Sequence, residues 1–348
     1  MRISVRKFVR ILFSLVLLFA CASPMVAQET AYPKEGDGII VFLKRYNRVG
    51  SDYQKAFINL NKDKLGKNNT LKMGVKYTLP PLKDGKKGSS SPTNTTSAPK
   101  RRTNEPLFGK ALATIKPTSS ELKDACFYLV SGHGGPDPGA IGKMGNHELH
   151  EDEYAYDIML RLARNLMMRG AQVHIIIQDA KDGIRDEQFL ANSKRETCMG
   201  KAIPFNQISR LEQRCTAINN LSKKDPEPYK RAIFIHIDSR SKNQRTDVFF
   251  YHKDKDAAGK QLAKTMRTTF QRKYEKHQPG RGFSGTVEAR GLYVLRHTIP
   301  TSVFVELGNI QNQHDQQRII LNNNRQALAN WLCEGFITDY KNSMQKKK

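Results

Sequence analysis

Residues Cys126–Tyr156 read CFYLVSGHGGPDPGAIGKMGNHELHEDEYAY, and the architecture of the chain is built around this stretch. Its first five residues, Cys126–Val130, are apolar and are followed by Ser131-Gly132, a pattern that favours a buried strand over a helix. His133 therefore lies just past the end of a strand. Because ligands bind at the carboxyl edge of open α/β sheets, the sequence places a candidate site residue there.

Short apolar runs alternate with amphipathic segments through the rest of the chain. A helix is predicted from about Glu151 to Arg169, where Gly170 closes a run of apolar residues at helical spacing. The other expected strands are 171–177, 231–237, 248–251, 292–295 and 302–305, and the other expected helices are 207–221, 256–274 and 322–340. This alternation predicts an α/β domain over residues 106–345, with a mostly parallel twisted sheet and helices on both faces.

The composition adds a strong positive charge to this fold. At 348 residues the chain is long enough for one sizeable core and a small accessory module. Lys and Arg number 58 against 33 Asp and Glu, a net charge of +25, which favours anionic polymers or surfaces as partners. No nucleic-acid recognition motif accompanies this charge, so nucleic acid is not the expected partner.

The first residues have the pattern of a secretory signal over residues 1–27. Basic residues precede an apolar stretch from Ile11 to Ala22, and a cleavage point follows Ala27. The stretch is shorter than the roughly 20 residues of a membrane-spanning helix, so a periplasmic or secreted protein is expected, without a transmembrane anchor. An alternative is processing at Cys21 within a lipoprotein-like cleavage box, which would give an outer-membrane-attached lipoprotein.

Residues 30–81 predict a small strand–helix–helix–strand (βααβ) module. The helical face is formed by Ile39, Ile40, Phe42, Leu43 and Tyr46, and the strand alternation by Val75, Tyr77 and Leu79. The segment resembles the lysin motif, a glycan-binding module, through Tyr32, Gly36-Asp37, Asn61, Met73-Gly74 and Tyr77–Pro80, and departs from it at Pro33 and Gly38. The alternative is a module that only packs on the main domain.

A linker is predicted over residues 82–105. Lys83–Arg102 reads KDGKKGSSSPTNTTSAPKRR and has almost no apolar side chains. Such a composition does not bury enough apolar surface to offset the ordering of the chain, so a flexible basic spacer is expected.

Four cysteines follow the expected signal: Cys126, Cys198, Cys215 and Cys333. They lack the close spacing of a zinc knuckle, and Cys126 is expected to be a small buried side chain in its strand. Cys198 and Cys215 are candidates for a disulfide in an oxidising compartment, a pairing that sequence does not decide.

The predicted strands lead into side chains that bind metals. His133, His236 and Glu306 each follow an apolar run, and Glu151 opens the first predicted helix of the domain. Two neutral imidazoles and one carboxylate, with a fourth position left to water, make a catalytic zinc site. A further carboxylate is then left for proton transfer.

Four motifs, in chain order GHGGPDPGAIG, EDEYAYDIMLRLARNL, FIHIDS and PTSVFVELGNIQN, closely resemble the zinc-dependent N-acetylmuramoyl-L-alanine amidases of bacterial cell-wall turnover. The resemblance covers about residues 126–340. It implies that His133, Glu151 and His236 bind Zn²⁺ and that Glu306 is the catalytic general base. It also implies peptidoglycan as the substrate, cleavage of the amide between N-acetylmuramic acid and L-alanine, and an activator protein as a potential partner.

Two alternatives accompany the ligand assignment. Glu148 lies nearer the family's usual distance after His133, but the following helix aligns with the family's pattern only if Glu151 is the ligand, with three extra residues in the loop. His147 and His150 are then loop residues and not ligands.

Other positions bear on the substrate groove. Leu211, Arg214 and Asn219 match the family's helix before the second histidine, and Arg290 or Arg296 is expected to line the groove. The chain departs from the family at Ile237-Asp238 and at Asn309, and these departures predict an altered groove.

Two other functions remain open at this stage. A zinc exopeptidase of the carboxypeptidase type would use similar ligands but would release a free terminal amino acid. A non-catalytic peptidoglycan-binding protein would have no use for Glu306.

Overall fold

The structure of the chain is a computed structural model that describes residues 29–82, apart from 34–36, 47, 49, 67 and 68, and residues 103–345. The expected signal segment, the Cys21 site and most of the expected linker lie outside the described residues. The chain divides into two compact units, Met1–Thr95 and Thr96–Lys348. None of the described helices combines the length and the hydropathy that crossing a bilayer requires.

The first unit has the predicted βααβ order. Its elements are β1 Thr30–Ala31, α2 Ile39–Arg45, α3 Ser51–Leu60 and β2 Tyr77–Thr78, with β1 and β2 antiparallel. Its core consists of Ala31, Phe42, Leu43, Phe57, Tyr77 and Leu79. The Asn61 side chain donates to the carbonyls of Phe57 and Thr78 and accepts the Thr78 N–H, so one buried amide ties the end of α3 to β2.

The buried face of α2 is narrower than predicted. Ile39, Phe42, Leu43 and Tyr46 follow the i, i+3, i+4, i+7 spacing of one helical stripe and belong to or pack against the core. Ile40, which was expected on the same face, is 62% exposed because it lies one residue off this stripe.

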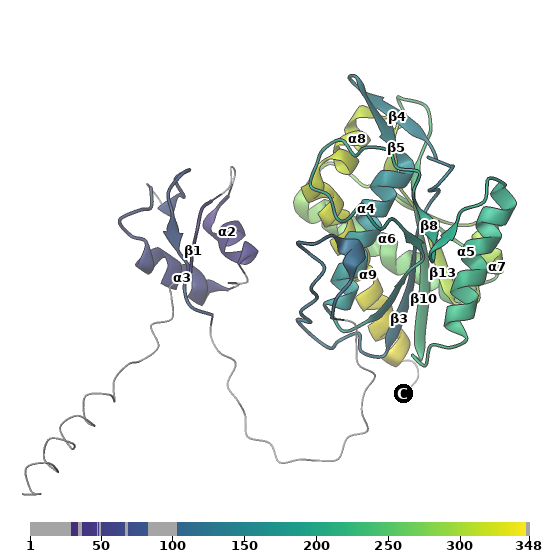
Figure 1. The fold of residues 1–348 in the computed structure, drawn as a ribbon, viewed down its shortest axis with the longest axis horizontal. Coiled ribbons are helices and arrows are strands. Elements are labelled where there is room, and N and C mark those ends of the chain that lie inside the picture. Colours follow the sequence, from purple (N-terminus) through teal and green to yellow (C-terminus); the bar gives the residue numbers. More distant parts are fainter. Residues whose placement is uncertain are drawn as a thin grey trace, which may run out of the picture. The chain divides into compact units, whose positions relative to one another are not determined.

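A six-stranded sheet forms the centre of the second unit (Figure 1). Its strand order is β12-β11-β13-β10-β3-β6. The strands are β3 Ala125–Ser131, β6 Gln172–Ile175, β10 Tyr229–Asp238, β11 Phe249–His252, β12 Thr286–Ala289 and β13 Thr301–Asn309. Strands β6, β3, β10 and β13 are parallel, whereas β11 pairs antiparallel with β13 and parallel with β12. The predicted mostly parallel sheet is confirmed.

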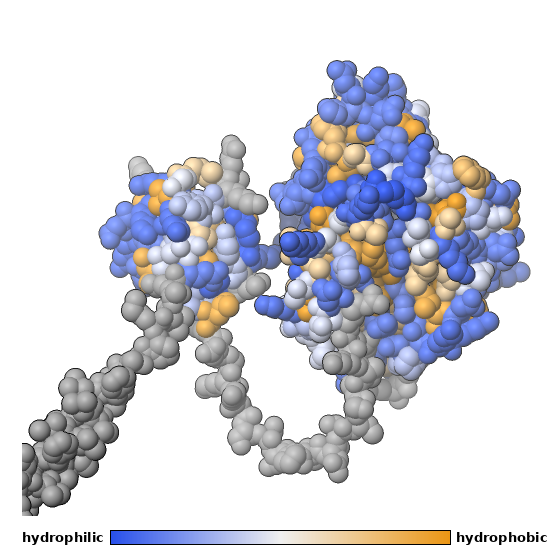
Figure 2. Space-filling view, in the orientation of Figure 1, coloured by the Kyte–Doolittle hydropathy of each residue, from blue (hydrophilic) through white to orange (hydrophobic). Residues whose placement is uncertain are grey.

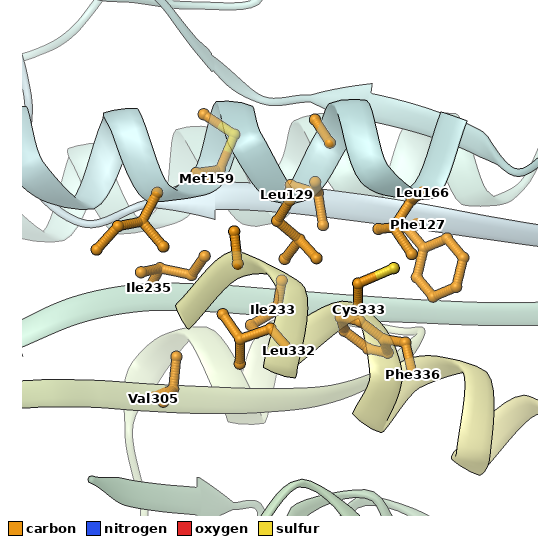
Figure 3. Close-up of a cluster of buried hydrophobic side chains, with 14 of the residues drawn as sticks. Phe127, Leu129, Met159, Leu166, Ile233, Ile235, Val305, Leu332, Cys333 and Phe336 are labelled. Atoms are coloured by element: carbon orange, nitrogen blue, oxygen red, sulfur yellow. The ribbon is translucent and has the colours of Figure 1, made fainter. Parts of the chain in front are cut away.

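Helices cover both faces of this sheet (Figure 1). On one face lie α4 Glu151–Met167, α6 Ala257–His277 and α9 Asn322–Gln345, and on the other α5 Gln207–Ser222 and α7 Tyr293–His297. Side chains alternate along each strand, so Phe127 and Leu129 pack under α4 and α9 (Figure 3), while Cys126 and Tyr128 face the other layer. Strand β3 is buried on both faces, and this explains why its residues form a continuous apolar run instead of an alternating pattern.

Several small elements were not predicted. They are the 3₁₀ turn η2 Pro106–Phe108, the hairpin β4 Ile141–Met144 and β5 His147–His150, the small sheet of β7 Ile177–Gln178, β8 Thr197–Cys198 and β9 Lys201–Ala202, the edge strand β12, and the helix α8 Gln313–Ile320. The hairpin and α8 lie at the same end of the second unit (Figure 1). The strands among these unpredicted elements are two to four residues long, which is too short to show an alternation of apolar and polar residues in the sequence.

Two predicted strands need correction. Residues 292–295 begin the helix α7 instead, in which Val294 and Leu295 are buried and Tyr293 stacks on His297 one turn later, with ring centroids 3.9 Å apart. The predicted strand 171–177 is divided, because β6 ends at Ile175 and the chain then enters β7 in the small sheet.

The four described cysteines are free and buried, so the structure has no disulfide between Cys198 and Cys215. Both side chains belong to the apolar layer on the α5 face of the sheet. The surface of the second unit that is visible in Figure 2 is mostly hydrophilic, with scattered apolar residues.

Candidate metal centre

Four separate elements carry the predicted site residues to the carboxyl edge of the sheet. His133 follows β3, Glu151 is the first residue of α4, His236 lies in β10 and Glu306 lies in β13. The parallel register of β10 and β13 sets His236 directly beside Glu306. The convergence is therefore a consequence of sheet order and strand register.

His133, Glu151 and His236 form a cluster, here called the carboxyl-edge cluster. One ligand atom from each residue lies within 4.8 Å of the other two. His133 Nε2 is 3.2 Å from Glu151 Oε2, and His236 Nδ1 is 2.9 Å from Glu151 Oε1. Two ring nitrogens and a carboxylate at these distances are a donor set that a divalent cation accepts.

Two positions beside the carboxyl-edge cluster, Gly132 and Gly139, have no room for a side chain. A Cβ on Gly132 would lie 2.3 Å from the His236 ring, and one on Gly139 would lie 2.7 Å from Glu151 Oε2 and from the His133 ring. His133 itself has a φ of 58°, a left-handed conformation that is uncommon for a residue with a side chain. Such strain gathers at functional sites, where surrounding contacts hold it.

Glu151, and not Glu148, belongs to the cluster. Glu151 is buried, and its carboxylate accepts the backbone N–H groups of Ala140 and Ile237 at 2.9 and 3.0 Å. The side chain of Glu148 is 65% exposed and pairs with His150. Residues 141–150 form the β4–β5 hairpin, which accounts for the longer loop between His133 and Glu151.

His147 and His150, which were predicted to be loop residues, lie in strand β5 and also lie outside the cluster. The His147 ring stacks on Phe189, with centroids 3.8 Å apart, and His150 Nε2 is 3.3 Å from Glu148 Oε2. Neither belongs to a group of described side chains that could hold a metal.

Asp137 and Arg210 are site residues that the sequence reasoning missed. Asp137 Oδ2 lies 3.0 Å from His133 Nδ1 and accepts a hydrogen bond from Arg210 Nη2 at 2.6 Å. A proton on Nδ1 would donate to Asp137, while Nε2 is directed at Glu151. The sequence could have indicated Asp137, because it lies only four residues after His133 in a turn. It could not have indicated the ion pair with Arg210, which depends on where α5 packs.

The electrostatics of the cluster favour a cation. Burial lowers the pKa of His133, but Glu151 and Asp137 outweigh burial and raise it to about 10. Burial raises the pKa of Glu151, but His133 and His236 outweigh that effect and hold it below its usual range. Burial lowers the pKa of His236. Glu151 and Asp137 therefore favour a positive charge at His133, and a bound metal ion would provide a positive charge at the same place.

Glu306 faces the cluster as a carboxyl group without a hydrogen-bond partner. Its Oε2 atom is buried and accepts no hydrogen bond from any described group. Burial raises the pKa of Glu306 well above its ordinary value, and the charges of Glu151 and Asp238 raise it further. An orphaned polar atom in a native interior marks a place where a ligand, a water or a proton is expected.

A cavity of about 180 Å³ opens next to the cluster. Its lining consists of His133, Asp137, Gln207, Arg210, Leu211, Arg214, Phe234, His236, Val294 and Phe304. Leu211 and Arg214, two of the residues that match the family's helix, lie in α5 and line this cavity, and Arg214 donates to the His133 carbonyl at 3.1 Å. Asn219 instead joins α5 to the chain around α7, through His297 and Ile299.

Neither Arg290 nor Arg296 is among the described residues that line this cavity. The Arg290 guanidinium lies over the Tyr251 ring, 4.7 Å from its centroid. The arginines that line this cavity are Arg210 and Arg214, both from α5, and a groove role for Arg290 or Arg296 stays a prediction.

The two departures from the family pattern have defined contacts. Asp238 pairs with Arg240 and faces Glu306. Asn309 is fully buried, and its amide bonds to the backbone at Arg240, Ser241, Gln244 and Gln311. The amide at 309 thus fixes the loop that follows β10.

A mostly parallel sheet with titratable side chains converging at its carboxyl edge is the arrangement of α/β proteins that bind ligands at this edge. Residues 128–338 match the family described as N-acetylmuramoyl-L-alanine amidase, and the chain belongs to this family. Membership makes it a hydrolase of the amidase class that acts on the peptidoglycan of the cell wall.

Individual relatives are distant in sequence. The germination-specific N-acetylmuramoyl-L-alanine amidase of Bacillus subtilis (strain 168) is 24% identical over 200 residues, which cover 57% of this chain and 72% of that protein. The amidase of Clostridium difficile 630 has a TM-score of 0.46 and 21% identity, covering 63% of this chain and 98% of its own. The CwlD amidase of Clostridioides difficile, solved in complex with the GerS lipoprotein, has a TM-score of 0.46 and 16% identity, covering 62% and 98%.

Proposed function

We propose that the second unit uses one zinc ion to hydrolyse the amide between N-acetylmuramic acid and L-alanine in peptidoglycan. His133, Glu151 and His236 would hold the ion, and Glu306 would be the general base. The observation that carries the proposal is the convergence of these three side chains beside the unpartnered Glu306 Oε2, in a chain of the amidase family.

The residues present fit a catalytic zinc ion. Zinc in catalytic sites takes three nitrogen or oxygen ligands and leaves a position open to solvent or substrate. The carboxyl-edge cluster offers that number of ligands, and the adjoining cavity gives access to it. Asp137 supports the assignment, because metal-binding histidines usually direct their second ring nitrogen at a carboxylate.

Zinc, when bound, supplies a Lewis acid that polarises a carbonyl and makes water a stronger acid. Glu306 is the side chain placed to accept the proton of the attacking water and to return a proton to the departing amine. Its raised pKa suits this role, because a carboxylate that holds a proton more tightly is a better base. Arg210 and Arg214 give the cavity a positive wall on the side of α5.

Product analysis tests the proposal against the zinc exopeptidase. The full chain is incubated with a soluble muropeptide, and the products are identified by mass spectrometry with and without a chelator. We expect intact stem peptide and free N-acetylmuramic acid-containing sugar, no products with the chelator, and recovery after zinc is added. Release of single terminal amino acids would support the exopeptidase, and the absence of any product would support a binding protein.

The first unit is proposed to hold the enzyme on glycan strands, as its resemblance to the lysin motif implies. A flexible tether raises the local concentration of substrate without any new contact at the active site. Each unit has a core built from its own residues, so removal of residues 30–81 leaves the core of the second unit intact. We expect the truncated chain to bind intact sacculi less and to cleave soluble muropeptide at the same rate; unchanged sacculus binding would refute the role.

Export is part of the same proposal. A substrate outside the cytoplasmic membrane requires a secreted or periplasmic enzyme, and residues 1–27 have the pattern of a secretory signal. Lipid attachment at Cys21 and an activator protein remain predictions. Metabolic labelling with a fatty-acid analogue separates a lipidated chain from a cleaved, soluble one.

A further inference from the structure

We propose that Cys126, His174 and Asp225 form a second divalent-cation site, of the zinc class, at the amino edge of the sheet. One ligand atom from each of them lies within 4.8 Å of the other two. We call this group the amino-edge cluster. Cys126 lies near the start of β3 and seven residues before His133, which follows the end of this strand, so at about 3.3 Å per residue the two clusters are roughly 20 Å apart.

Three elements bring the amino-edge cluster together. Cys126 is near the start of β3, and His174 lies in β6, directly opposite Tyr128 in the parallel register. Asp225 is in the turn after α5, where its backbone N–H donates to the carbonyl of Leu221. The convergence therefore depends on strand register and on where α5 ends.

Two of the distances between ligand atoms are close to those around a zinc ion. Cys126 Sγ is 3.6 Å from Asp225 Oδ2, and His174 Nε2 is 3.1 Å from the same oxygen. Zinc bonds of about 2.3 Å to sulfur and about 2.1 Å to nitrogen or oxygen place tetrahedral corners about 3.6 Å apart for S–O and about 3.4 Å for N–O. The Tyr128 hydroxyl, 2.6 Å from Asp225 Oδ2, is a further oxygen at this point.

The surroundings attract a cation and admit it. The Asp225 carboxylate brings negative charge to within 3.6 Å of the Cys126 sulfur. The side chains of His174 and Asp225 are 15% and 14% exposed, whereas Cys126 is fully covered. An ion would enter from the imidazole and carboxylate side and meet the thiol at the bottom.

The competing interpretation is a hydrogen-bonded network without an ion. Tyr128, His174 and Cys126 can all donate to the Asp225 carboxylate. Such a network would tie the same elements together but would bind no metal, so metal binding separates the two interpretations.

The cation would stabilise the placement of α5. It would join β3 and β6 to the turn at the end of this helix, whose other turns carry Arg210 and Arg214 to the cavity at the carboxyl edge. Its role is structural and does not depend on the proposed function.

Cobalt spectroscopy of the full chain tests the second site, because thiolate–Co²⁺ coordination gives a near-ultraviolet charge-transfer band that nitrogen and oxygen ligands do not give. The carboxyl-edge cluster contains no sulfur. We expect the band in the reduced wild-type chain loaded with Co²⁺, its loss in Cys126→Ser and His174→Gln, and its retention in His236→Ala. The matched control is Cys333→Ser, which removes another buried thiol and should keep the band.

Zinc content gives a second readout. Elemental analysis should find a second equivalent of zinc in the wild type, lost in His174→Gln and retained in Cys333→Ser. A wild-type chain without the cobalt band would overturn the proposal whatever the folding of the variants. A band that survives in Cys126→Ser would overturn it as well, because another thiol would then be the ligand.

Discussion

The two ends of strand β3 present similar donor atoms in different settings. In the carboxyl-edge cluster the backbone of His133 has a left-handed conformation, and a Cβ at Gly132 or Gly139 would clash with the ligands. The cluster also faces Glu306 Oε2, a buried oxygen without a hydrogen-bond partner among the described groups. In the amino-edge cluster Cys126 and His174 occupy regular strand positions, Asp225 lies in the turn after α5, and its carboxylate is surrounded by donors. A cluster with a strained backbone and an unpartnered polar atom is suited to catalysis, whereas a cluster whose polar atoms are hydrogen-bonded is suited to a structural role.

The largest expected effect comes from removing a ligand at the carboxyl edge. His236→Ala should lose one equivalent of zinc and reduce amide hydrolysis to background, because two remaining ligands do not hold the ion. Metal content and muropeptide turnover are the measurements. The control is His174→Gln at the other end of β3, which should keep hydrolysis. Equal loss of activity in both variants would remove the functional distinction between the two ends.

Glu306→Gln should separate chemistry from metal binding. The substitution keeps the shape of the side chain and removes the base, so we expect kcat to fall by about 10²- to 10⁴-fold with zinc content unchanged. Steady-state kinetics on a soluble muropeptide measures this effect. A variant that retains wild-type kcat would show that Glu306 takes no part in proton transfer.

Gly139→Ala tests the close packing around the carboxyl-edge cluster. The new Cβ would lie 2.7 Å from Glu151 Oε2 and from the His133 ring, so the ligands must move, and we expect activity to fall by about 100-fold. Gly145→Ala is the matched control, because Gly145 also has a positive φ, 59°, but has open space around its Cβ position. Similar losses in the two variants would attribute the effect to backbone strain alone.

Asp137→Asn should have the smallest effect of this series. An amide can still contact His133 Nδ1 but carries no charge, so zinc affinity should fall by about 10-fold. Added zinc should restore most of the activity, which a merely unfolded variant would not show. Competition with a chromogenic chelator measures the affinity, and an unchanged affinity would mean that Asp137 does not orient the histidine.

Much of this site could be predicted because strand ends are visible in sequence. The apolar runs before His133, His236 and Glu306 mark buried parallel strands, and such strands deliver their last residues to one edge. The alignment of the following helix with the family's pattern also favoured Glu151 over Glu148, and the structure brings Glu151 into the cluster.

The rest depended on contacts that no local pattern records. The pairing of Arg210 with Asp137 follows from the packing of α5, and the meeting of Cys126, His174 and Asp225 follows from the β3–β6 register. Strand β12 was missed because its four residues are all at least partly exposed and carry no apolar run.

Anomalous diffraction at the zinc edge, from crystals of the full chain grown with zinc, tests the central claim most directly. The account predicts a peak enclosed by His133, Glu151 and His236, with the carboxyl group of Glu306 beside it. A zinc-containing, active protein with no peak among these three side chains would contradict the account.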